Sequence, residues 1–253
     1  MARLSWLPVF AVIILWEVVA RSGAFTPFIL PAASSVFQRI WSDALSGELA
    51  VHLGLTLYRS LAGFAIAVVL GIVLGVLVAR VRPVGWFFDP LISVGFPMPK
   101  IVFLPIVTLW LGFHDTTKIS MVVFDALFPV VTATIAGTRA VERELAWSAR
   151  SLGASERELV REVVLPAALP QILTGLQVAL PIALIVCVVT EMLTSGKGLG
   201  AAMISASRMV DSTGVFAGIV EIALAGYLLV KGMARLRRRL LLWHAEALPP
   251  ATV

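Results

Sequence analysis

Long apolar runs separated by short polar stretches make up most of this chain. Six runs are each close to the roughly 20 residues that a helix needs to cross the hydrocarbon core of a bilayer. They cover residues 4–20, 57–79, 88–113, 119–137, 172–193 and 214–230. The pattern predicts an all-α polytopic membrane protein with about six transmembrane helices, in which residues 1–253 form one transmembrane domain.

The first run has an alternative interpretation as part of a cleaved signal peptide. Val18 and Ala20 loosely fit a small-residue cleavage site. Pro8 within the run and Glu17 beside the site disfavour cleavage. We therefore expect a membrane span here.

The second run carries a small residue at every fourth position. Such spacing places these residues on one face of a helix, where the backbone of a neighbouring helix can approach closely. They are Gly63, Ala67, Gly71, Gly75 and Ala79. The stripe predicts a helix–helix contact along residues 57–79.

The third run is broken by prolines, and Lys100 lies within it. Proline removes a backbone donor and kinks a helix, which membranes tolerate where protein or a water-filled cavity satisfies the freed groups. The prolines are Pro90, Pro97, Pro99 and Pro105. An interrupted helix is expected over residues 88–113.

The composition and the charge distribution agree with a membrane protein. Hydrophobic residues make up 59% of the chain and charged residues 14%, against about 25% charged residues in soluble domains. The net charge of +5 admits a nucleic-acid partner. However, the basic residues lie beside apolar runs, which the positive-inside rule explains better. Their distribution places both ends of the chain and residues 139–170 in the cytoplasm, and we expect no nucleic-acid partner.

Residues 139–170, here called the elbow, are a charged segment between two predicted spans. Residues 142–152 favour a helix that Gly153 would end. Ser155, followed three residues later by Glu158, has the pattern of a capping box, so a second helix is expected to start at about Glu156. Leu165-Pro166 and Pro170 are expected to end it. The elbow is therefore predicted to be a rigid helix–glycine–helix unit that another protein contacts.

The spacing of Gly153, nine residues and then Val163-x-Leu165-Pro166 resembles the EAA cytoplasmic loop of ABC importer permeases. Further stretches are similar to the permeases for taurine, aliphatic sulfonates and nitrate. They are ILPAASSV (29–36), PMPKIVFLPIVTLWLGF (97–113), SARSLGAS (148–155), LPAALPQILTGLQVAL (165–180), TEMLTSGKGLG (190–200) and RRRLLLWHAE (237–246). The resemblance implies the type I ABC importer permease architecture.

The resemblance also implies that the elbow couples the membrane helices to a separate ATPase. The positions it assigns to coupling are Glu144, Ala149, Gly153, Ala154, Val163, Leu165 and Pro166. The chain departs from the family at one point, because Trp147, Ser148 and Ala149 stand where the family has Glu-Ala-Ala. We hypothesise that Glu144, one helical turn earlier, replaces the missing glutamate.

The resemblance further implies a function and a set of partners. The chain would be the permease subunit of an ATP-driven importer in a bacterial inner membrane, forming a path for taurine or an alkylsulfonate. Its partners would be an ABC ATPase subunit that binds ATP and Mg²⁺, a periplasmic solute-binding protein and a second permease copy. Nitrate, an aromatic acid or a vitamin precursor are alternative solutes. A secondary transporter is a more distant alternative.

Ionisable residues within the predicted spans are candidates for the translocation path, because isolated charges in a bilayer usually face a cavity or a partner. Lys100, which lies between Pro99 and Ile101 in the proline-broken run, would suit an anionic solute. The other candidates for the path are Pro97, Pro99 and Glu191. The alternative is that Lys100 reaches the interface or pairs with Asp125 or Glu191.

Catalytic and cofactor motifs are not apparent. Ser195-Gly196-Lys197-Gly198 lacks the spacing and hydroxyl of a phosphate-binding loop, so no ATP site is expected on this chain. His52, His114 and His244 are scattered, and the single Cys187 lies in an apolar run where it is expected to be a core residue. We therefore expect neither an enzyme nor a metal site.

Overall fold

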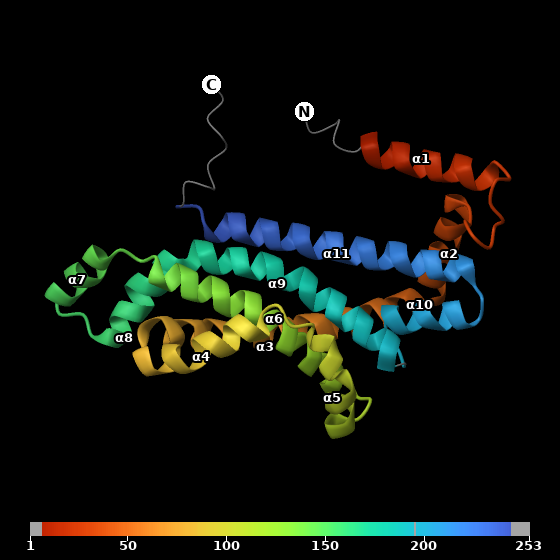
Figure 1. The fold of residues 1–253 in the computed structure, drawn as a ribbon. Coiled ribbons are helices and arrows are strands. Elements are labelled where there is room, and N and C mark those ends of the chain that lie inside the picture. The colour runs from red at the N-terminus through yellow and green to blue at the C-terminus, as the bar shows by residue number, and fades with distance from the viewer. Residues whose placement is uncertain (1–6, 195, 244–253) are drawn as a thin grey trace. The chain divides into compact units, whose positions relative to one another are not determined.

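The computed structural model describes residues 7–194 and 196–243, and within these ranges it contains helices and no β-strand (Figure 1). The helices are α1 (Leu7–Arg21), α2 (Ala33–Ser46), α3 (Glu48–Arg80), α4 (Arg82–Gly95), η2 (Lys100–Phe103), α5 (Leu104–Leu111), α6 (Asp115–Arg139), α7 (Arg143–Ser151), α8 (Glu156–Glu158), η3 (Leu159–Val164), α9 (Leu165–Thr194), α10 (Leu199–Arg208) and α11 (Ser212–Leu240). The η2 segment is a 3₁₀ helix and η3 is a π-helix.

Among the described residues, four helices are long and apolar enough to cross a membrane. They are Glu48–Arg80, Asp115–Arg139, Glu156–Thr194 and Ser212–Leu240. The pair Arg82–Gly95 and Lys100–Leu111 adds a fifth if it forms one broken span, with a bend of 96°. The expected interruption of residues 88–113 is therefore confirmed. Helix α1 has 15 residues, shorter than a full span, so the crossing at residues 4–20 stays a prediction.

The chain divides into two compact units. Unit 1 comprises Met1–Leu57 with Val188–Gly226, and unit 2 comprises Tyr58–Cys187 with Tyr227–Val253. Helices α3, α9 and α11 each contribute to both units.

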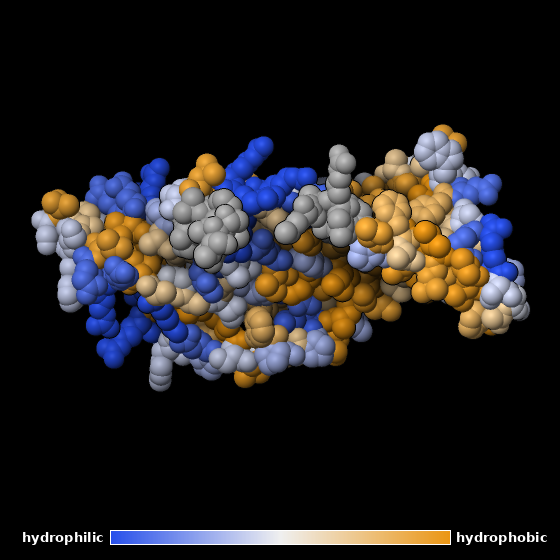
Figure 2. All heavy atoms as spheres, turned by 90° about the horizontal axis from the view of Figure 1, so that it is seen from above, coloured by the Kyte–Doolittle hydropathy of each residue, from blue (hydrophilic) through white to orange (hydrophobic). Residues whose placement is uncertain are grey.

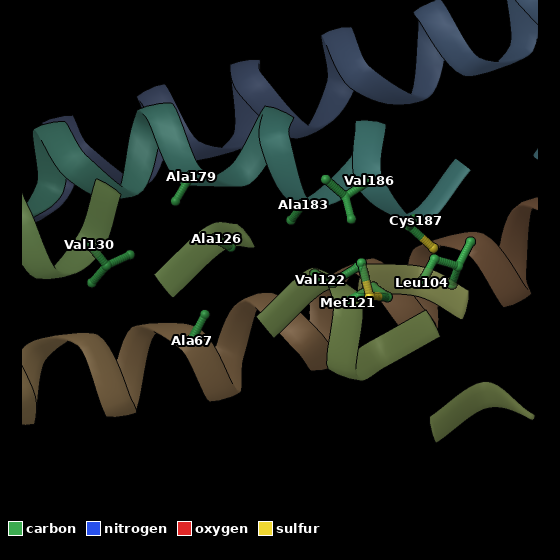
Figure 3. Close-up of a cluster of buried hydrophobic side chains, with 10 residues drawn as sticks. All are labelled: Ala67, Leu104, Met121, Val122, Ala126, Val130, Ala179, Ala183, Val186 and Cys187. Atoms are coloured by element: carbon green, nitrogen blue, oxygen red, sulfur yellow. The ribbon is translucent and has the colours of Figure 1, made fainter. Parts of the chain in front are cut away.

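The core of unit 2 is built mainly from small and β-branched side chains of α3, α6 and α9, with Leu104 of α5 beside them. Ala67 on α3 faces Ala126 and its neighbours on α6, and Ala179 and Ala183 point toward them from α9 (Figure 3). Cys187 belongs to this core and is fully buried, as expected. Small side chains allow these helices to approach closely, which is the dominant means of packing within membranes.

The small-residue stripe of α3 lies in this contact. A Cβ atom on Gly63 would lie 2.6 Å from Val122, and one on Gly71 would lie 2.7 Å from Val130. Both distances are too short for real atoms, so α6 occupies the space that a side chain would need. The close contact predicted from the spacing is confirmed.

Apolar side chains also cover much of the outer surface. On α1, Phe10, Val12 and Ile14 are each more than 60% exposed, and Figure 2 shows hydrophobic side chains gathered over this helix. On the outer face of α3, Val69 and Val73 are exposed in the same way. Continuous apolar surface of this kind is typical of helices that face lipid.

Candidate functional site

The first part of the elbow is helix α7, which ends in a Schellman motif. Gly153 adopts a left-handed conformation with φ of 89°. The Ala154 N–H donates to the Ala149 carbonyl at 3.1 Å, and the Gly153 N–H donates to the Arg150 carbonyl at 3.0 Å. This pattern satisfies the last carbonyl groups of a helix and favours glycine because of its positive φ. The predicted break at Gly153 is confirmed.

The second helix begins with the predicted capping box. The Ser155 Oγ accepts a hydrogen bond from the Glu158 N–H at 3.3 Å, and the Glu158 carboxylate accepts one from the Ser155 N–H at 2.8 Å. Two backbone donors at the helix start are therefore satisfied reciprocally. The turn between α7 and α8 is therefore fixed by the Schellman motif at the end of α7 and by the capping box at the start of α8.

The expected end of this helix at Leu165-Pro166 and Pro170 is wrong. Helix α8 continues through the π-helical η3 into α9, so that one helical path runs from Glu156 to Thr194. Pro166 lies inside this path directly after the π-helical turn, which changes the hydrogen-bond register where the proline supplies no N–H. The elbow is consequently joined to a membrane span without a loop.

Ion pairs connect the elbow to the end of α3. The Glu156 carboxylate lies 2.7 Å from Arg150 on α7 and 2.9 Å from Arg80, the last residue of α3. Glu156 is mostly exposed, so solvent screens both pairs and neither is a large source of stability. Their importance is geometric, because one carboxylate joins three helices. Nothing in the sequence pattern pairs Arg80 with Glu156.

The outer surface of α7 is partly apolar. Trp147 is 59% exposed and Leu152, which follows the helix, is 86% exposed. Glu144 is also exposed on α7, whereas Ala149 and Ala154 are half-buried at the turn. Farther along, Val163 and Leu165 are half-buried and Pro166 is exposed. Large exposed apolar side chains beside charged ones are typical of surfaces that contact another protein.

Lys100 lies in a closed environment at the bend between α4 and η2. Its side chain is 6% exposed, and its Nζ donates to the Phe96 carbonyl at 2.8 Å. The Asp125 carboxylate lies 3.4 Å away, and the Phe128 ring centroid lies 4.5 Å away. The alternative in which Lys100 pairs with Asp125 is therefore the one that the structure contains. Pro97 and Pro99 are exposed in the bend, and a path role for these three residues stays a prediction.

Glu191 lies in unit 1 at the end of α9 and is fully buried. Its carboxylate accepts hydrogen bonds from the Thr56 hydroxyl at 2.9 Å and from the Gly200 N–H at 3.1 Å. Thr56 in turn accepts the Leu199 N–H at 2.9 Å, and His52 Nδ1 accepts the Gly198 N–H at 3.0 Å. Three successive backbone donors are thus held by side chains of α3 and α9.

We call Glu191, Thr56 and His52 the latch. A Cβ atom on Gly198 would overlap the Glu191 carboxylate, so glycine is required there for space as well as for its φ of 135°. The latch fixes the start of α10. The sequence singled out Glu191 as a candidate for the translocation path, which stays a prediction, and gave no sign that Thr56 and His52 contact the same loop.

A charged cluster of unit 1 fixes the start of α11. Asp211 accepts the Gly214 N–H at 2.9 Å and pairs with Arg39 at 2.7 Å. The Gly214 hydrogen bond and then the Arg39 guanidinium hold the pKa of Asp211 below its usual value, and Asp211 raises the pKa of Arg39. Both groups are therefore charged at neutral pH, and they join α2 to the segment before α11.

Comparisons with known proteins agree with this arrangement. The family described as binding-protein-dependent transport system inner membrane component matches residues 67–241. The taurine transport system permease protein TauC of Escherichia coli (strain K12) is 32% identical over 236 residues, 91% of this chain and 86% of that protein. A putative aliphatic sulfonates transport permease protein, SsuC of Bacillus subtilis (strain 168), is 33% identical over 233 residues, 92% of this chain and 84% of that protein.

Other similar proteins carry different substrate names. The riboflavin transport system permease protein RibX of Chloroflexus aurantiacus is 29% identical over 250 residues, 96% of this chain and 93% of that protein. Among solved structures, a chain from an inward-facing conformation of the MetNI methionine ABC transporter has a TM-score of 0.65 at 17% sequence identity. The superposition covers 78% of this chain and 98% of that chain. At that identity the likeness shows the type I importer permease fold.

Proposed function

The chain belongs to the binding-protein-dependent transport system inner membrane components, and from this premise we propose that it forms the path of an ATP-driven importer for small sulfonates. It is a membrane-spanning permease of an ABC transporter. The proposed solute is taurine or an alkylsulfonate, because the permeases named for these solutes are 32% and 33% identical over most of the chain. The likeness to RibX keeps a vitamin or its precursor as the second candidate.

The elbow is the observation that carries the proposed mechanism. It is fixed by the Schellman motif at Gly153 and the capping box at Ser155, and it continues without interruption into α9. A rigid unit of this kind can pass a displacement from a separate ATPase to a membrane helix. We infer that two permease copies alternate between inward and outward access as two ATPase subunits close, and that ATP is hydrolysed only on those subunits.

We propose that the ATPase contacts α7 through Trp147 and Leu152. The family's glutamate is absent at position 147, and the tryptophan there is 59% exposed. Buried tryptophans are among the strongest contributors to protein–protein contacts, commonly by 2 kcal/mol or more. The partner surface is therefore expected to be an apolar groove rather than a basic one.

The experiment uses the assembled complex of permease, cognate ATPase and binding protein in liposomes. Trp147→Ala should lower the solute-stimulated ATPase rate at limiting ATPase subunit by roughly tenfold or more, because about 2 kcal/mol of binding is lost. Trp86→Ala, a control at a more exposed tryptophan of α4, should leave the rate unchanged. Trp147→Glu should not restore the rate if the groove is apolar. A normal rate in Trp147→Ala would contradict the proposed contact, and a normal rate in Glu144→Ala would exclude Glu144 as the substitute glutamate.

The solute is tested on the partner binding protein. Ligand titrations should find a sulfonate that binds, and the same ligand should stimulate the ATPase rate of the complete assembly. Stimulation by riboflavin or a pyrimidine precursor instead would select the second candidate. The purified permease alone is expected to show no ATP hydrolysis, and hydrolysis without partners would overturn the importer assignment.

A further inference from the structure

A large open pocket lies where the elbow meets the end of α3. Its volume is about 830 Å³, and it is lined by the last turn of α3, by Thr138 near the end of α6, and by residues of α7, α8 and η3. All these residues belong to unit 2. The pocket is separate from the exposed outer face of α7 at Trp147, which does not line it.

The pocket has an excess of positive charge. Arg80, Arg150, Arg157 and Arg161 line it, and Glu156 is the carboxylate among them. That carboxylate is shared by Arg80 and Arg150. Within the described residues, Arg157 and Arg161 have no acidic partner. Two guanidinium groups therefore remain available for an anion, and guanidinium binds phosphate oxygens in bidentate geometry.

Another part of the pocket lining, here called the apolar wall, carries no charge. It is formed by Val76 and Leu77 of α3 and by Val81, which directly follows α3. Leu77 is 42% exposed and Val81 is 40% exposed. The wall is thus continuous with a helix that is long and apolar enough to span the membrane. A ligand that fills the pocket should be anionic at one end and hydrocarbon at the other.

An unsatisfied polar group in the same lining supports a missing ligand. Thr138 lines the pocket and is 7% exposed, and its hydroxyl is buried without a hydrogen-bond partner in the described part of the chain. Buried hydroxyl groups without partners are rare in native proteins and call for an explanation. A phosphate or glycerol oxygen entering the pocket is one kind of partner that would satisfy it.

We propose that this pocket binds an anionic phospholipid, with its headgroup phosphate between Arg157 and Arg161 and its acyl chains along Leu77 and Val81. Basic residues at the end of a membrane span attract anionic headgroups, each Lys or Arg by roughly fivefold in affinity. A free phosphate would leave the apolar wall uncovered, which is why a lipid is the better occupant. A lipid held in this position joins the elbow to α3 and stiffens the connection that Glu156 begins.

The experiment measures lipid binding to the full chain purified in mild detergent. Phosphatidylglycerol and phosphatidylcholine are titrated separately into delipidated protein, and the bound fraction is read by native mass spectrometry. Phosphatidylglycerol is expected to bind more tightly than phosphatidylcholine. The double variant Arg157→Gln and Arg161→Gln should weaken phosphatidylglycerol binding by roughly thirty-fold, the effect of two surface charges.

The control is Arg235→Gln with Arg238→Gln, which removes the same charge from exposed positions of α11 outside the pocket. It should weaken phosphatidylglycerol binding far less than the pocket variant does, because these two arginines do not line the pocket. Leu77→Trp, which fills the space beside the apolar wall without altering charge, should also weaken binding. It tests the proposal even if the arginine variant does not fold.

Equal losses in the pocket and control variants, or no loss in either pocket variant, would overturn the proposal. So would displacement of phosphatidylglycerol by millimolar inorganic phosphate, which would identify a free-anion site. These readouts require neither ATPase nor transport, so they are independent of the proposed importer function.

Discussion

Individual polar side chains in this permease act mainly by holding backbone. In the latch, Thr56 both donates to Glu191 and accepts from Leu199, so one hydroxyl completes two hydrogen bonds. Lys100 similarly holds the carbonyl of Phe96 at the bend after α4. A polar group inside a membrane protein is costly unless it has such partners. The latch and the Lys100 site therefore fix the positions at which the helical path changes direction.

The latch makes a prediction for a single isosteric substitution. Thr56→Val should lower the free energy of unfolding by about 1–3 kcal/mol, because it leaves the Leu199 N–H without its buried acceptor and removes a donor to Glu191. Thr194→Val is the matched control, since Thr194 is also buried in unit 1 but, among the described residues, donates only to the Thr190 carbonyl of its own helix. Thermal unfolding of the purified variants measures both. Similar losses of stability in the two would show that the latch has no special role.

At the scale of helices, local sequence patterns predicted the contact of α3 with α6 and the turn between α7 and α8, but not the continuation of α8 into α9. Small residues at every fourth position of α3 were enough to predict that another helix packs closely against this face, and the structure places α6 there. The capping box at Ser155 and the break at Gly153 depend on neighbouring residues alone, so they were also predictable. The continuation through Pro166 was not, because Leu165-Pro166 has the pattern of a helix end and no local pattern specifies a π-turn over Leu159–Val164. The Arg80–Glu156 pair and the latch join residues far apart in the chain, which no local pattern specifies.

The stripe supplies a prediction for helix packing. Gly71→Ala should destabilise the protein by about 1–3 kcal/mol, because the added Cβ would lie 2.7 Å from Val130 and force α3 away from α6. Gly54→Ala provides the comparison on the same helix, where a Cβ meets nothing within 4 Å. It should be neutral or stabilise the helix by up to about 1 kcal/mol. Thermal unfolding should separate the two variants, and an equal response would contradict close packing at Gly71.

For the molecule as a whole, the central question is which side of the membrane carries the elbow. The distribution of Lys and Arg predicts the cytoplasmic side, and the proposed ATPase contact at Trp147 requires it. Helix α6 connects the turn before Asp115 to the elbow after Arg139 and is long enough to cross the bilayer. Its two ends should therefore lie on opposite sides, with Thr116 outside and Ser151 inside.

Cysteine labelling tests this topology directly, because the single native cysteine, Cys187, is fully buried and should not react. Thr116→Cys and Ser151→Cys place a thiol at exposed positions near the two ends of the α6 span. A membrane-impermeant maleimide should label Thr116→Cys in right-side-out vesicles and Ser151→Cys only in inside-out vesicles. The unsubstituted chain, treated in parallel, reports any reaction of Cys187. The reverse pattern would place the elbow outside, where no cytoplasmic ATPase could reach Trp147, and would exclude the proposed coupling mechanism even though the fold remained the same.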